Sequence, residues 1–174
     1  MADYYDIHDE PEEDEHRFVI GHSGNSRLVF LGRCPSFGNS NRTDPTMNYI
    51  KRTAVGSNYD SHLLLNIYPQ RIQSLGDFDQ GLHRQNIEII IKHINDGSHV
   101  WAAWDDLSRR PYLLHCRTHI LWLLQKKSNL HWKVCFAGGL PALPDNVMNL
   151  FEYTPPYIRD DEKDYALKEL DYRE

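Results

Sequence analysis

A polar loop at residues 33–45 (RCPSFGNSNRTDP) directly follows a short apolar run, and it concentrates side chains that could bind a ligand. Ser36 and Asn39 offer hydrogen-bond donors and acceptors, and Arg33 offers a positive charge. The loop lacks the G-x-x-x-x-G-K-[ST] spacing, which excludes a P-loop. We therefore predict that Arg33, Ser36 and Asn39 bind substrate.

The same loop holds two candidate catalytic residues. Cys34 is a candidate thiolate nucleophile if Arg33 lowers the pKa of its thiol; the alternative is a small buried apolar residue. Asp44 is a candidate general base, and the alternative is that it caps a helix that begins at Pro45. A Ser-His nucleophile has little support, because no histidine is adjacent to Ser36.

A second polar group follows the strongest apolar run of the chain, SHLLLNIY at residues 61–68. Asn66 carries an amide that can donate and accept at once, as the edge of a nucleobase requires, or it ties down a neighbouring loop. Tyr68 could stack on a base, and Arg71 could reach a phosphate. Trp104 ends another apolar run and belongs either to the site or to the core.

The elements that must position these residues alternate between strand and helix, after an additional strand or two near residues 17–20. This order predicts an α/β fold with three layers, α/β/α, around a mostly parallel central sheet of about four strands. Ligands of such sheets bind beyond the carboxyl ends of the strands, where both polar groups lie. The expected strands cover residues 27–31, 61–68, 99–104 and 132–136, and the expected helices cover residues 47–54, 82–96 and 111–125.

Charge divides the chain into three parts. Residues 1–15 carry eight acidic side chains and no basic one, so we predict a disordered acidic tail. Residues 16–158 form the predicted single α/β domain, with 15 Lys and Arg against 10 Asp and Glu. Residues 159–174 are expected to hold a charged helix at 160–170. A mildly basic domain suits an anionic ligand or nucleic acid, and an ordinary surface with a solubilising tail explains the charges equally well.

Composition narrows the class of protein. The three cysteines form neither a disulfide framework nor a C-x-x-C zinc motif, and free thiols suggest a cytoplasmic protein. No signal peptide or membrane-spanning run is present, so we expect no membrane contact. His115 and His119 could share a helical face, but a structural role fits their apolar surroundings better. We predict neither a metal nor a cofactor.

Four ordered blocks of sequence resemble a known family. They are CPS…DPT (34–46), LLLNIYPQR (63–71), AAWD (102–105) and GLPALP (139–144). Together they are similar to an uncharacterised bacterial and phage family, catalogued as domain of unknown function number 1643, over roughly residues 27–146. That family has an N-P-S…D-P-T signature and a late H-P element.

The order of these motifs also resembles, more distantly, that of the uracil-DNA glycosylase superfamily. GRCP (32–35) stands where that superfamily has G-x-[DN]-P, SHLLLN (61–66) where it has LLLN, and GLPALP near its H-P-S-P. The resemblance implies a uracil-DNA-glycosylase-like fold in which Asn66 reads a base and Arg71 faces the nucleic-acid backbone. It also implies hydrolysis of the bond that joins a base to its sugar.

Two departures from that pattern bear on catalysis. Cys34 replaces the acid or amide of the first motif, and Leu140 or Leu143 stands in place of the late histidine. Each lost group typically contributes 10²–10⁴ in rate, so base binding survives such losses more readily than hydrolysis does. His22, His115 or His131 could substitute only if the fold brings one of them to the pocket.

Three functional hypotheses follow. The first is a protein that binds a nucleobase, nucleotide or nucleic acid, with a base-excising N-glycosylase activity that is altered or lost. The alternative is a non-enzymatic interaction protein, such as an acidic nucleic-acid mimic or a phage or host regulatory factor, whose acidic N-terminus contacts a protein partner. The third is a transferase that depends on Cys34.

Overall fold

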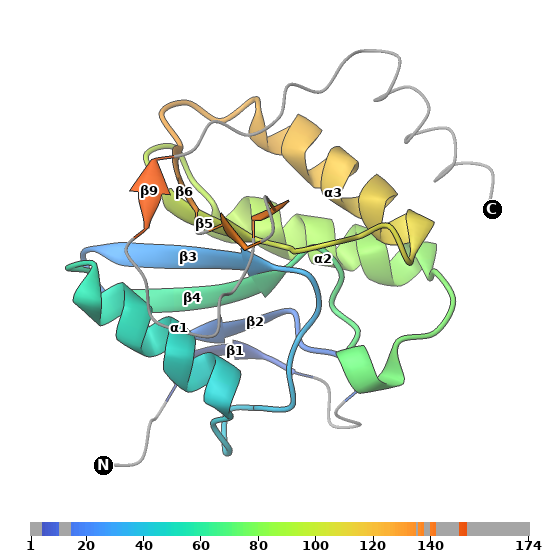
Figure 1. Cartoon of the computed structure of the whole chain (residues 1–174), viewed down its shortest axis with the longest axis horizontal. Helices are drawn as coiled ribbons and strands as arrows, with labels where there is room; N and C mark the ends of the chain where they lie inside the picture. Colours follow the sequence, from blue (N-terminus) through green and yellow to red (C-terminus); the bar gives the residue numbers. More distant parts are fainter. Residues whose placement is uncertain (1–4, 11–14, 135, 138–139, 142–149, 153–174) are drawn as a thin grey trace.

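One mixed sheet forms the centre of the protein, and a computed structural model describes residues 5–10, 15–134, 136–137, 140–141 and 150–152 of it (Figure 1). The sheet has seven strands, and β7 and β8 form a separate antiparallel pair. The strands are β1 (Ile7–Asp9), β2 (Val19–Gly21), β3 (Arg27–Gly32), β4 (Ser61–Asn66), β5 (His99–Ala103), β6 (His131–Val134), β7 (Phe136–Ala137), β8 (Leu140–Pro141) and β9 (Phe151–Glu152).

The sheet order is β1-β2-β4-β3-β5-β6-β9, and its four central strands are parallel. Gly32 at the end of β3 lies opposite both Asn66 of β4 and Ala103 of β5. Three strands therefore end level with one another, and the polar segments that follow them start from the same edge. The register depends on the apolar runs of these strands, because a shift by one residue would turn their buried side chains to the wrong face.

The predicted α/β class and the four parallel strands are confirmed, but the expected total of about four strands is wrong. Three antiparallel strands extend the sheet: β2 pairs with β4, β1 pairs with β2, and β9 pairs with β6. Each has only two or three residues, too few to show an alternating pattern in the sequence.

Three helices pack on the sheet: α1 (Pro45–Gly56), α2 (Gln80–His93) and α3 (Pro111–Leu124), and a short 3₁₀ turn, η1 (Ile72–Ser74), follows β4. Along β3, Leu28 and Phe30 pack with residues of α1, whereas Val29 and Leu31 pack with residues of α2 and α3. The helices thus cover both faces of the sheet, as Figure 1 shows. Right-handed crossovers require this placement, because the step from β3 to β4 runs opposite to the steps from β4 to β5 and from β5 to β6.

The segment at residues 5–10 is folded against the domain, so the predicted disordered tail is wrong for these residues. Tyr5 is 1% exposed and stacks on His22 at 4.6 Å between ring centroids. β1 pairs with β2, and the side chain of Glu10 is nearly buried. Backbone pairing and one buried ring outweigh the repulsion of the acidic block. The helix expected at residues 160–170 lies outside the described residues.

In the part of the chain that the structure describes, no helix has both the length and the apolar character needed to cross a bilayer.

Candidate functional site

The strand order creates a crevice between the ends of β3 and β5. The chain leaves β3 toward α1 and β4 on one side, and it leaves β5 toward α3 and β6 on the other. Two loops that diverge from adjacent strands leave a gap above the sheet, which is where open α/β sheets bind ligands.

A cavity of about 200 Å³, partly open to solvent, lies at these strand ends. It is on the α1 side of the sheet, because Phe30, Leu64 and Ala103 of its lining belong to the core that packs on α1. The first polar loop and the amide at position 66 face this one cavity, as the sequence predicts. Its polar or charged lining residues are Arg17, Arg33, Cys34, Ser36, Thr46, Asn66 and Asp105.

Asn66 presents its side-chain amide to the cavity. Its backbone carbonyl accepts a hydrogen bond from Asn86 Nδ2 at 2.8 Å, but the amide makes no hydrogen bond with any described residue. The residue is 3% exposed, and a buried amide without a partner is costly. A Cβ atom at Gly32 would lie 3.0 Å from Asn66 Oδ1 and 2.5 Å from Phe30 Cε1, so glycine at position 32 leaves room for the amide. The amide therefore keeps its donors and acceptor free at the cavity.

Asp44 organises the loop instead of facing the ligand. Its Oδ1 accepts from the backbone N–H of Met47 at 2.8 Å, which caps α1, and its Oδ2 accepts from the N–H of Gly38 at 2.7 Å. Burial raises the pKa of Asp44, but the nearby Ser36 side chain, the hydrogen bonds from Met47 and Gly38 and the charge of Arg17 outweigh it, so the pKa is lowered. The carboxylate is therefore ionised and occupied, and the capping alternative accounts for this residue.

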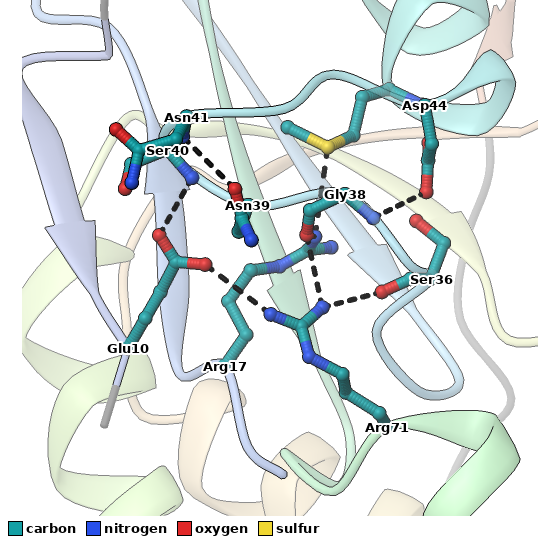
Figure 2. Close-up of polar contacts among 10 residues, drawn as sticks. Glu10, Arg17, Ser36, Gly38, Asn39, Ser40, Asn41, Asp44 and Arg71 are labelled. Atoms are coloured by element: carbon teal, nitrogen blue, oxygen red, sulfur yellow. Dashed lines mark hydrogen bonds and ion pairs between the residues drawn. The ribbon is translucent and has the colours of Figure 1, made fainter. Parts of the chain in front are cut away.

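Arg71 also supports the loop from below, as Figure 2 shows. The side chain is fully buried and does not line the cavity. Its Nη1 donates to the carbonyl of Ser36 at 2.6 Å and to that of Gly38 at 2.9 Å. Its Nη2 pairs with Glu10 Oε2 at 3.3 Å, and Glu10 Oε1 accepts from the N–H of Ser40 at 2.9 Å. The predicted phosphate contact is replaced by a structural one.

Arg17 is a lining residue that the sequence analysis did not select. It is 2% exposed, and its Nη1 donates to the same carbonyl of Gly38 at 2.5 Å (Figure 2). Burial, together with the nearby charge of Arg71, lowers the pKa of Arg17 to about 10, so it remains a cation at neutral pH. A buried arginine has no local pattern in sequence, since its partners lie 21 or more residues away.

The remaining predicted residues divide between cavity and core. Arg33 and Ser36 line the cavity, and so does Cys34, but burial raises the pKa of its thiol to about 12. A thiol with that pKa is protonated at neutral pH, which removes the basis for a thiolate nucleophile.

Besides Arg71, three predicted binding residues are absent from the cavity lining. Tyr68 and Trp104 are buried in the core on the side of α2 and α3, and the hydroxyl of Tyr68 accepts from the N–H of Asp79 at 2.9 Å. Asn39 pairs with Arg42 in a turn of the loop. These three residues therefore do not line the cavity.

Asp105 is the acidic group that the cavity does contain. It follows β5, is exposed, and has a positive φ of 61°, a conformation that is uncommon outside glycine. No described histidine lines the cavity: His22 contacts Tyr5, His131 begins β6 at the opposite edge of the sheet, and His115 is on α3. None of the three supplies the group that the late motif lacks.

His119, one of the two histidines considered as metal ligands, contacts a histidine of another helix. His119 Nδ1 lies 3.2 Å from Nε2 of His83 on α2, so it joins two helices. Two effects lower the pKa of His83 to about 3: mainly its burial, and to a smaller extent the nearby His119. Among the described residues, no group of three or more His, Cys, Asp or Glu side chains could hold a metal ion.

Comparison with known families places the chain. A family described as Protein of unknown function (DUF1643) matches residues 17–141. The chain belongs to the DUF1643 family. The match to DUF1643 begins at Arg17 and includes every residue that lines the cavity, whereas β1 lies before it. No curated protein and no solved structure matches this DUF1643 chain.

Proposed function

We propose that this protein binds a nucleobase, in a nucleotide or a nucleic acid, in the cavity at the strand ends. The observation that carries the proposal is the amide of Asn66, which is buried, lacks a hydrogen bond to the described residues and faces the cavity. An amide pairs with the edge of a base through one donor and one acceptor. The proposal includes a uracil-DNA-glycosylase-like arrangement of the layers, which the helices on both faces and the strand-end cavity support.

Four residues that line the cavity with Asn66 fit a planar, polar ligand. Phe30 and Leu64 give the cavity apolar walls, and Arg33 and Ser36 add polar groups at the loop. Convergent polar groups beside apolar walls are typical of small-molecule sites. The volume of about 200 Å³ is below the ~300–1,000 Å³ of pockets for drug-sized ligands, which favours one base over a dinucleotide.

The proposal is tested by calorimetry with a panel of bases, nucleosides, nucleotides and short oligonucleotides. Asn66→Ala should weaken the best ligand by about tenfold or more, and Asn66→Asp should change which base is preferred, because the NH₂ donor is lost. Asn95→Ala, an exposed amide after α2, is the matched control. No binding across the panel, or equal affinity in all three variants, would remove the proposal.

Base excision is the candidate activity at this site, and Asp105 is the observation that favours it. Water would add to C1′ of the sugar as the bond from C1′ to the base nitrogen breaks, and the base would leave with a proton from water. Asp105 is the exposed carboxylate at the cavity and the group available to orient that water. Release of free base from oligonucleotides that contain mismatched or damaged bases is the assay. Asp105→Asn should reduce release by about 10² or more, and retention of full activity would eliminate this role.

The interaction-protein alternative finds no favouring observation in the described residues. Asp6 accepts hydrogen bonds from the backbone N–H and the hydroxyl of Ser23. Glu10 forms an ion pair with Arg71 and accepts a hydrogen bond from the N–H of Ser40. These two acidic groups bond to their own domain, whereas Asp9 and Glu15 of the same segment are exposed.

A further inference from the structure

We propose that Arg17 forms an anion subsite in the cavity and that the ligand is a nucleoside monophosphate whose terminal phosphate binds there. The subsite itself rests on Arg17 alone, and the nucleoside part of the inference rests on the proposed function.

The guanidinium of Arg17 has unused donors. Nη1 donates to the carbonyl of Gly38 and lies 3.6 Å from Met47 Sδ, a weak acceptor. Nε has no hydrogen-bond partner although it is buried, and Nη2 has none among the described residues. A guanidinium carries five N–H donors, and buried donors are almost always satisfied. Arg17 therefore has donors to spare for a ligand in the cavity that it lines.

The two carboxylates near Arg17 are committed elsewhere. Glu10 pairs with Arg71 and the N–H of Ser40, and Asp44 accepts from Gly38 and Met47. In the described part of the chain, no carboxylate lies within ion-pair distance of Arg17. Arg17 and Arg71 moreover donate to one shared oxygen, the carbonyl of Gly38, at 2.5 and 2.9 Å. Glu10 therefore pairs with Arg71, and Asp44 is held by backbone N–H groups, so neither carboxylate takes up the free donors of Arg17.

The usual anion site of such folds is closed here. The N-terminus of α1, where phosphates often bind, is already capped by the carboxylate of Asp44. Arg33 adds a second cation to the cavity lining, and Thr46 adds a hydroxyl. A phosphate oxygen pair matches the fork of a guanidinium in bidentate geometry. Asn66 lines the same small cavity, so base and phosphate of one mononucleotide have partners there.

Inorganic phosphate is the direct probe of the subsite. At low ionic strength, phosphate should raise the melting temperature of the full chain in a saturable way, and chloride at equal ionic strength should not. Acetate tests whether any oxyanion suffices, and we expect it to bind more weakly than phosphate. If phosphate has no more effect than chloride, or no more than acetate, the phosphate assignment is overturned.

Variants assign the effect to Arg17. Arg17→Gln should weaken phosphate binding by roughly tenfold or more, since a hydrogen bond to a charged group is lost, and Arg17→Lys should weaken it less. Arg27→Gln removes a charge at the opposite end of β3 and should leave the affinity unchanged. Equal affinity in Arg17→Gln and wild type overturns the subsite. If the Arg17 variants do not fold, NMR on the wild type decides: phosphate must shift the Arg17 Nε–H and Gly38 N–H signals, and unchanged signals overturn the proposal.

Three ligands separate this inference from the proposed function. A nucleoside monophosphate should bind more tightly than its nucleoside, and Arg17→Gln should abolish the difference. If nucleoside and monophosphate bind equally, the subsite fails while base binding stands. If phosphate binds through Arg17 but no nucleoside adds affinity, base binding fails and the nucleotide assignment with it. If an oligonucleotide binds more tightly than the mononucleotide, the ligand is a nucleic-acid strand, and the assignment of a free nucleoside monophosphate is overturned.

Discussion

Glu10→Ala is the change that best tests how the polar loop is supported. The carboxylate joins three distant parts of the chain, because it pairs with Arg71 at 3.3 Å and accepts from the N–H of Ser40 at 2.9 Å. Arg71 is fully buried, and Glu10 is 8% exposed in its side chain, so solvent screens the pair little.

The loss in free energy of unfolding depends on the hydrogen-bond partners that Arg71 keeps in Glu10→Ala. Removing one partner of a buried ion pair typically costs about 3–5 kcal/mol, because the other charge is left uncompensated. Arg71 keeps the carbonyls of Ser36 and Gly38, which reduces the cost to about 2–3 kcal/mol. For a chain of this size, that loss lowers the melting temperature by roughly 4–12 °C.

Thermal unfolding followed by circular dichroism measures this shift, and urea titration gives the free energy. Asp9→Ala is the matched control, since Asp9 is an exposed acid in the same segment and its loss should change stability by about 0.5 kcal/mol or less. If Glu10→Ala and Asp9→Ala unfold at the same temperature as wild type, the segment at residues 5–10 does not support the loop, and our reasoning about the site fails with it.

Four further predictions concern single residues. Gly38→Ala should destabilise the protein by about 1–3 kcal/mol in urea titration, because a Cβ atom would collide with Met47 Sδ; a neutral result would mean that the loop adapts. Cys34, with its pKa raised to about 12, should resist iodoacetamide at pH 8 in the folded protein, and rapid alkylation seen by peptide mass spectrometry would contradict this. His83 is neutral when folded, so the unfolded chain binds more protons between pH 6.5 and about 3 and stability should fall as the pH drops through that window; His83→Phe should show a smaller fall between pH 7 and 5. Phe37 is 67% exposed on the loop and does not line the cavity, so Phe37→Ala should change neither the melting temperature nor the affinity for the best ligand, and weaker binding in calorimetry would extend the site to Phe37.

Elements that have their own internal pattern could be predicted from the sequence. The apolar run at β4 and the Asp44-Pro45 start of α1 are local signals, and both stand where they were predicted. β1 and β9 were missed because a strand of two or three residues is defined by its neighbour, not by its own composition. The same holds for Tyr5, whose burial depends on His22 and His62.

The site was predicted in part for a similar reason. Asn66 and the loop after β3 were found because the carboxyl ends of parallel strands meet at one edge. The alternation of side chains along β5 could also have separated Trp104 from Asp105: Ala103 and Asp105 lie toward the cavity, whereas Ala102 and Trp104 lie in the other core. Arg17 could not have been found, because the burial of this charged side chain depends on residues that are distant in the sequence.

The way in which the polar loop is tied down has a kinetic consequence. Its carbonyl and amide groups are held by residues 10, 17 and 71, and the Arg71–Glu10 pair alone joins positions 61 residues apart. Closing such long loops is slow, because the chain loses conformational entropy before the stabilising contacts form. We therefore expect the cavity to be completed late in refolding, after β2 has paired with β4. On the ribosome, the loop cannot reach its final shape until Arg71 has emerged, long after the loop itself has been made.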